Sequence, residues 1–175
     1  MIGLLILLIN VNMKMNFLNA GDNMVRISRK ANLIKLSDEQ IKQIVYFIEK
    51  QKDVVALFLF GSYGTKYQNY LSDVDFAILP SSLESVDTHK EVDFLTELQT
   101  LGRSDDINLI NLFKVPVTLQ RRILDEGRIL FCRDEIALAD FKEHVIRIYC
   151  DFEPDLKAFY RDYDAALREE FTGDC

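Results

Sequence analysis

Apolar residues recur at helical spacing in some stretches of the chain and form continuous runs in others. The helical spacing of three and four predicts helices at 37–52, 87–101, 116–127 and 134–172. Ser37 to Gln40 read as a capping box for the first of these helices. Gly102 is expected to end the second helix, while Pro116 and Gly127 suit the N1 and C′ positions of the third. Pro154 is expected either to kink the last helix or to begin another one.

The continuous apolar runs predict buried strands. They lie at Val54–Phe60, Asp73–Leu79, Ile107–Leu112 and Arg128–Cys132. Alternation of such strands with helices predicts an α/β or α+β fold, with helices packed on a sheet. Because no linker interrupts the pattern, we expect residues 24–175 to form a single domain that includes the C-terminal helix.

Residues 1–23 break this pattern and form an atypical apolar extension. The run Ile2–Val11 is shorter than the roughly 20 residues that span a bilayer, and no Lys or Arg precedes it. Three interpretations stay open: a start site assigned too early, a tail that docks on a partner, and a weak signal or anchor.

Composition narrows the classes of function. The 175 residues carry a formal net charge of −7, which disfavours stable nucleic-acid binding. Three scattered Cys and two His form neither a disulfide framework nor a zinc motif. We therefore expect a cytoplasmic protein that does not use a membrane.

Two acidic residues give the first indication of chemistry. Asp73 and Asp75 alternate with apolar residues, so a strand points both carboxylates to one face. Two carboxylates held side by side repel each other unless a cation lies between them. Oxygen ligands of this kind suit Mg²⁺ or Mn²⁺.

A Gly-Ser turn follows the apolar run that precedes these carboxylates. Gly61 lets the backbone approach a ligand closely, and the Ser62 hydroxyl adds a donor. If a helix begins at this turn, its free N–H groups can bind phosphate. A phosphate cradle beside paired carboxylates indicates metal-assisted chemistry on a nucleoside triphosphate, and the chain lacks the P-loop motif.

The block GSYGTKYQNYLSDVDFAIL resembles the two-part signature of the polymerase β-type nucleotidyltransferases. Within that superfamily the chain resembles the minimal nucleotidyltransferases (MNT), which are antitoxins of HEPN-domain toxins. The resemblance implies phosphate binding by Gly61 and Ser62 and metal binding by Asp73 and Asp75. It also implies the family's α+β fold, with a small mixed sheet, the Gly-Ser turn at a helix start and a long C-terminal helix.

The family's third carboxylate falls in the segment DDINLINL. Asn108 occupies the expected position there, and Asp106 precedes it by two residues on the same strand face. Asn carries no charge and cannot take a proton. Either Asp106 completes the metal and catalytic set with Asp73 and Asp75, or the protein is weakly active, or it binds nucleotide without turnover.

The resemblance implies an antitoxin that transfers AMP from Mg-ATP to a hydroxyl, expected to be a tyrosine, of a HEPN toxin with which it assembles. Tyr63 and Lys66 are further candidates for contacts to the nucleotide, beside core packing for Tyr63 and an exposed loop position for Lys66. Two alternatives are a degenerate enzyme that neutralises the toxin by binding alone and an aminoglycoside-type small-molecule nucleotidyltransferase.

Overall fold

The computed structural model describes residues 33–172 and their side chains as far as Arg168. The apolar extension at residues 1–23 lies outside this part of the chain. Within residues 33–172, no helix is long and apolar enough to cross a membrane.

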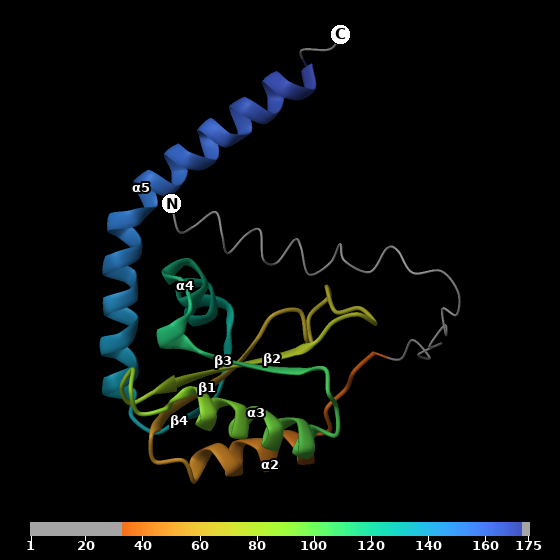
Figure 1. The fold of residues 1–175 in the computed structure, drawn as a ribbon. Helices are drawn as coiled ribbons and strands as arrows, with labels where there is room; N and C mark the ends of the chain where they lie inside the picture. Colours follow the sequence, from red (N-terminus) through yellow and green to blue (C-terminus); the bar gives the residue numbers. More distant parts are fainter. Residues whose placement is uncertain (1–32, 173–175) are drawn as a thin grey trace. The chain divides into compact units, whose positions relative to one another are not determined.

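A four-stranded mixed sheet lies at the centre of the fold (Figure 1). Its strands are β1 (Val54–Phe60), β2 (Val74–Pro80), β3 (Ile107–Asn111) and β4 (Arg128–Cys132). The order across the sheet is β3-β2-β1-β4. β1 is antiparallel to β2 and β4, whereas β3 is parallel to β2. The small mixed sheet that the family resemblance implied is confirmed.

Helices cover both faces of the sheet. They are α2 (Asp38–Glu49), α3 (Thr88–Gly102), α4 (Val117–Glu126) and α5 (Glu135–Thr172), with a short 3₁₀ turn η1 (Leu112–Lys114). α2 and α3 pack on one face, where Ile44, Ile48, Phe94 and Leu98 are buried. α4 and the first part of α5 pack on the other face through Ile123, Leu138, Phe141 and Val145. Both faces of β1 and β2 are therefore buried, which explains their continuous apolar sequences.

Local hydrogen bonds set most helix ends near the predicted positions. The capping box is present: the Gln40 N–H donates to Ser37 Oγ at 3.2 Å, and the Ser37 N–H donates to Gln40 Oε1 at 2.8 Å. The end of α3 differs, because Gly102 is its last helical residue and Arg103 adopts the left-handed conformation. Gly102 instead packs against Ile107, where a Cβ atom would collide.

The third predicted helix also differs at its ends. Pro116 is the N-cap of α4 rather than its first helical residue. Gly127 has φ −71°, so it does not form the left-handed cap that its position indicated. A side chain at Gly127 would meet the Ile123 carbonyl, so close approach is the reason for glycine there.

Helix α5 continues through Pro154 as one helix. Its first part packs on the sheet, but large apolar side chains beyond residue 150 are exposed. They are Phe152, Phe159, Tyr160 and Tyr163. The second part of α5 therefore adds little to the core of residues 33–172.

Candidate active site

The two carboxylates meet Asn108 at the edge of the sheet. Asp73 lies just before β2, Asp75 is its second residue, and the parallel register pairs Asp75 with Asn108 on β3. Asn108 Nδ2 donates to Asp73 Oδ2 at 3.2 Å and to Asp75 Oδ1 at 3.1 Å. One amide group therefore bridges both carboxylates and offsets part of their repulsion.

Strand alternation decides which face carries this group. Val74 and Phe76 pack with α2 and α3, whereas Ala77 packs with α4 and α5. Asp75 has the same parity as Ala77, so it lies on the α4 side of the sheet. Asp73 and Asn108 are exposed and Asp75 is half-buried, so the group is open to a ligand.

Gly61 brings the Gly-Ser turn into contact with the carboxylates. It follows Phe60, which pairs with Asp75 in the sheet. Its φ is +80°, and a Cβ atom there would lie 2.5 Å from Asp75 Oδ2. Only glycine fits both the backbone angle and the space, so the turn and the carboxylate pair form one site.

The Gly-Ser turn is not the start of a helix, contrary to the expectation. The Thr65 N–H and its hydroxyl both donate to the Ser62 carbonyl, at 3.1 and 2.7 Å, and residues 61–67 form successive turns. Gly64 has φ +73°, which a right-handed helix does not allow. Its N–H donates to Gln68 Oε1 at 2.9 Å.

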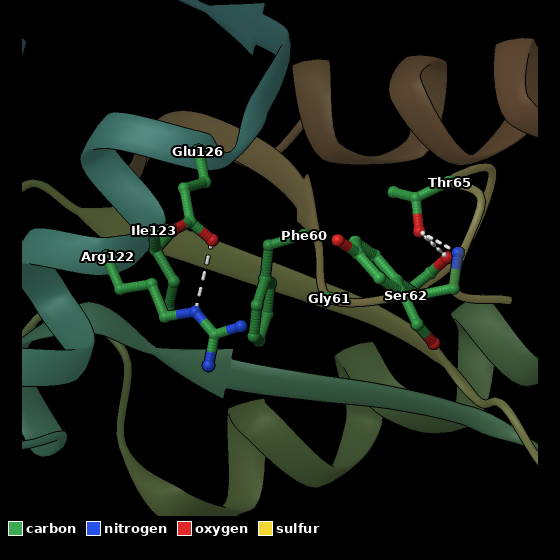
Figure 2. A pocket seen from close by; sticks show the side chains of 8 residues that line it. Phe60, Gly61, Ser62, Thr65, Arg122, Ile123 and Glu126 are labelled. Atoms are coloured by element: carbon green, nitrogen blue, oxygen red, sulfur yellow. Dashed lines mark hydrogen bonds and ion pairs between the residues drawn. The ribbon is translucent and has the colours of Figure 1, made fainter.

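A cavity of about 500 Å³ opens between this turn and α4. Figure 2 shows Ser62 and Thr65 on one side and Arg122 and Glu126 on the other, with Phe60 between them. Arg122 Nε and Glu126 Oε2 are 3.1 Å apart. The cavity therefore offers the Ser62 hydroxyl and the Arg122 guanidinium, which suit an anion, beside the Glu126 carboxylate, which opposes one.

A second cavity, of about 440 Å³, lies on the other side of the turn and includes Gly61 and Tyr63. The Leu36 N–H donates to Tyr63 Oη at 2.8 Å, and the Tyr63 ring packs against the core on the α2 side. Tyr63 thus fixes the segment before α2, while one side of the Tyr63 side chain stays accessible from the cavity. Its predicted contact with the nucleotide stays a prediction.

Lys66 is exposed, and its ammonium group lies 5.0 Å from the centre of the Tyr67 ring. Lys66 lines neither cavity beside the turn.

Asp106 lies just before β3, where its carbonyl accepts the Val74 N–H at 2.9 Å. The register places Asn108 rather than Asp106 opposite Asp75.

The side chains at this edge of the sheet provide some, but not all, of the ligands expected for a divalent cation. Among residues 33–172, no group of three or more His, Cys, Asp or Glu is arranged to hold a metal ion. The structure therefore does not gather Asp73, Asp75 and Asp106 into the expected three-carboxylate set. Asp73 and Asp75 still offer the hard oxygen ligands that Mg²⁺ and Mn²⁺ prefer. Asn108 could add its Oδ1 only after its amide turns, because Nδ2 now faces the carboxylates.

Neither Arg122 nor Glu126 was among the candidate site residues of the sequence. An Arg and a Glu four residues apart are typical of an ion pair on the surface of a helix, so their spacing carries no signal of a binding site. Only the packing of α4 over the end of β1 reveals that this pair also lines the cavity at Ser62.

Comparison with known proteins places the chain among nucleotidyltransferases. Residues 39–136, more than half of the chain, match the family model described as "Polymerase beta, Nucleotidyltransferase". A search of curated protein sequences found no match.

Solved structures match the fold. One is a complex of a tri-AMPylated Shewanella oneidensis HEPN toxin with MNT antitoxin: the match has a TM-score of 0.58 and 20% identity and covers 71% of this chain and 95% of that one. Another is a toxin–antitoxin structure with AMP-PNP: its TM-score is 0.59 at 21% identity, with 73% and 98% covered. At this identity the matches show a shared fold.

Proposed function

Because the chain belongs to the polymerase β nucleotidyltransferase family, we propose that it is an MNT-type antitoxin that transfers AMP from Mg-ATP to a hydroxyl group of a HEPN-domain toxin. The observation that carries this proposal is the contact of the Gly-Ser turn with the paired carboxylates. Gly61 lies against Asp75, and Asn108 joins Asp75 to Asp73.

In this proposal the carboxylate pair holds the metal. Asp73 and Asp75 would bind Mg²⁺, or Mn²⁺, through their oxygens. The ion would supply positive charge for the α-phosphate and for the departing pyrophosphate. Ser62 would donate its hydroxyl to the outer phosphates from the cavity that it lines.

The reaction exchanges one phosphorus–oxygen bond for another. The acceptor oxygen bonds to the α-phosphorus, the bond from that phosphorus to the bridging oxygen of the β-phosphate breaks, and pyrophosphate leaves with the electron pair. The acceptor gives its proton to water at the site, and Asn108 takes no part in this step because it has no basic atom.

Two features support a protein acceptor. Both solved structures named above are described as toxin–antitoxin structures, and one of them contains an AMPylated toxin. In addition, exposed aromatic side chains lie along the second part of α5. A partner that covers these side chains would remove an apolar surface from water.

Mass spectrometry tests the proposal directly. The cognate HEPN protein would be incubated with this chain, ATP and Mg²⁺, and its intact mass measured. We expect a gain of whole AMP units that disappears with EDTA. An unchanged mass, under conditions in which a confirmed relative modifies its own toxin, would contradict catalysis.

Asn108 favours a second candidate function, neutralisation by binding alone. An amide in place of the third carboxylate lowers the negative charge available to a metal and removes a base. The chain would then hold the toxin in a complex whose nucleotide site does not turn over.

Replacing both carboxylates separates the two candidates. The Asp73→Ala, Asp75→Ala double variant should lose protection against the toxin if catalysis neutralises it. Protection at the wild-type level, with the two proteins still co-eluting, would favour binding alone. The Asp105→Ala variant is a control, because it removes an exposed carboxylate that lies beside Gln99 and Arg103 at the end of α3 rather than in the group that Asn108 joins to Asp73 and Asp75.

A further inference from the structure

Helix α4 carries two similar ion pairs one residue apart. Arg121 Nε lies 2.6 Å from Asp125 Oδ2, and Arg122 Nε lies 3.1 Å from Glu126 Oε2. Because Arg121 and Arg122 are consecutive residues of a helix, their side chains point to different surroundings. Arg121 faces α5, where its guanidinium is 5.9 Å from the centre of the Tyr149 ring.

Arg122 and Glu126 instead line the cavity beside the Gly-Ser turn (Figure 2). They also contribute to the groove that Arg121 lines between α4 and α5. Arg122 supplies the only cationic side chain among the residues of the cavity at Ser62, within the described part of the chain. A polyphosphate bound there needs positive charge in addition to hydroxyl donors.

We propose that Arg122 is the cationic contact for the phosphates at this site, and that Glu126 holds its guanidinium in the cavity until the phosphates replace the carboxylate. This inference rests on the proposed function, since it assumes that Ser62 faces the phosphates of a nucleotide. It adds a residue from outside the Gly-Ser and Asp-x-Asp segments.

The exchange of partners is favourable for electrostatic reasons. The side chains of Arg122 and Glu126 are 69% and 68% exposed, so water screens their attraction and the pair contributes little stability. A triphosphate carries several negative charges, and a planar guanidinium can bind phosphate oxygens through two parallel hydrogen bonds. Glu126 can therefore give up the guanidinium at small cost.

Calorimetric titration of the full chain tests the role of Arg122. The probes are Mg-ATP and inorganic tripolyphosphate, each at two salt concentrations. Arg122→Ala should weaken the binding of both probes about tenfold, the loss expected for a charge-assisted hydrogen bond. Arg121→Ala, the matched control, should bind both within about twofold of wild type, because Arg121 does not line the cavity.

Two further variants separate charge from structure. Arg122→Lys keeps the charge but not the two-pronged geometry, so it should recover part of the affinity. Glu126→Gln should bind both probes more tightly than wild type, because it removes the carboxylate that competes for Arg122. A merely structural role would move the thermal stability of Arg122→Ala and leave the binding of tripolyphosphate unchanged.

The outcomes distinguish this inference from the proposed function. Wild-type binding of ATP that Arg122→Ala leaves intact would overturn the role of Arg122 and leave the proposed function standing. Binding of tripolyphosphate through Arg122 without binding of ATP would support the anion site and contradict the proposed function. If wild type bound neither probe, both proposals would fall.

Discussion

Single residues decide how the carboxylate pair is held. Asp73 and Asp75, two residues apart at the start of β2, repel each other, and the Asn108 amide donates to both. Gly61 lies so close to Asp75 that a Cβ atom there would force the Asp75 carboxylate to move. The site is therefore organised before any cation or nucleotide arrives, by one amide and one missing Cβ.

Alanine at Gly61 should disturb this arrangement more than alanine at Gly64. Both residues have positive φ, but a Cβ atom at Gly64 would meet nothing within 4 Å. Gly64→Ala should therefore cost about 1 kcal/mol of backbone strain alone. Gly61→Ala should cost about 2 kcal/mol or more, because Asp75 must also move.

Urea unfolding measures the two costs, and titration with Mn²⁺ reports on Asp75. We expect Mn²⁺ binding to weaken only in Gly61→Ala. Equal effects of the two substitutions on Mn²⁺ binding would show that the close approach to Asp75 does not matter.

A carboxylate in place of the Asn108 amide should lower stability and raise metal affinity. Without a divalent cation, Asn108→Asp loses two charge-assisted hydrogen bonds and adds a third negative charge, at a cost of about 2 kcal/mol. With Mn²⁺ present, the extra charge should tighten binding about tenfold. Thermal unfolding with and without Mn²⁺ measures both effects.

The control for this variant is Asn108→Ala, which loses the hydrogen bonds and adds no charge. It should be destabilised without gaining metal affinity. Metal binding by Asn108→Asp no tighter than that of wild type would mean that the third position does not face the cation.

At the scale of elements, β3 positions Asn108, and a polar contact fastens the end of that strand. Asn111 is buried, and its Nδ2 donates to Glu91 Oε1 of α3 at 2.6 Å. Its Oδ1 accepts the Phe113 N–H at 3.0 Å at the start of η1. One side chain therefore joins the strand, the turn that follows it and the helix that precedes it.

Removal of this contact should weaken the fold markedly. Asn111→Ala leaves the Phe113 N–H without its acceptor and should cost about 2–3 kcal/mol in urea unfolding. Lys114→Ala is the control, because Lys114 pairs with the same Glu91 oxygen at 2.8 Å from a more exposed position. It should cost less than about 1 kcal/mol. If both variants lost a similar free energy of unfolding, the ion pair between Lys114 and Glu91, and not the hydrogen bonds of Asn111, would account for the loss.

For the molecule as a whole, the core ends partway along α5. Phe141 is buried, and its ring packs edge-on against Phe113 with the ring centres 5.3 Å apart. Phe159, further along the same helix, is 62% exposed. The first part of α5 thus belongs to the sheet, while the second part presents an apolar surface.

Alanine substitutions at Phe141 and Phe159 should show that only the first part of α5 belongs to the core. Phe141→Ala should cost about 3–4 kcal/mol, because it opens a cavity in the core. Phe159→Ala should change the stability of the isolated chain by less than about 0.5 kcal/mol. Urea unfolding of the chain without a partner is the measurement. A large loss in Phe159→Ala would mean that the second part of α5 is packed within the isolated chain.

Patterns along the chain were enough to locate the elements and to indicate the chemical class of the site. Hydrophobic periodicity depends on which face of an element is buried. It therefore located the strands, and the helices that pack on them, to within a few residues. The short-range spacing of Gly61, Ser62, Asp73 and Asp75 indicated phosphate and metal chemistry, because these residues lie at the ends of consecutive strands.

The remaining features of the site depend on long-range packing. The parallel register of β2 and β3 placed Asn108, not Asp106, opposite Asp75. The packing of α4 brought Arg122 and Glu126 to Ser62 from a distant part of the sequence. A pattern along the chain carries the spacing of neighbours, whereas contacts between distant segments depend on how the elements pack.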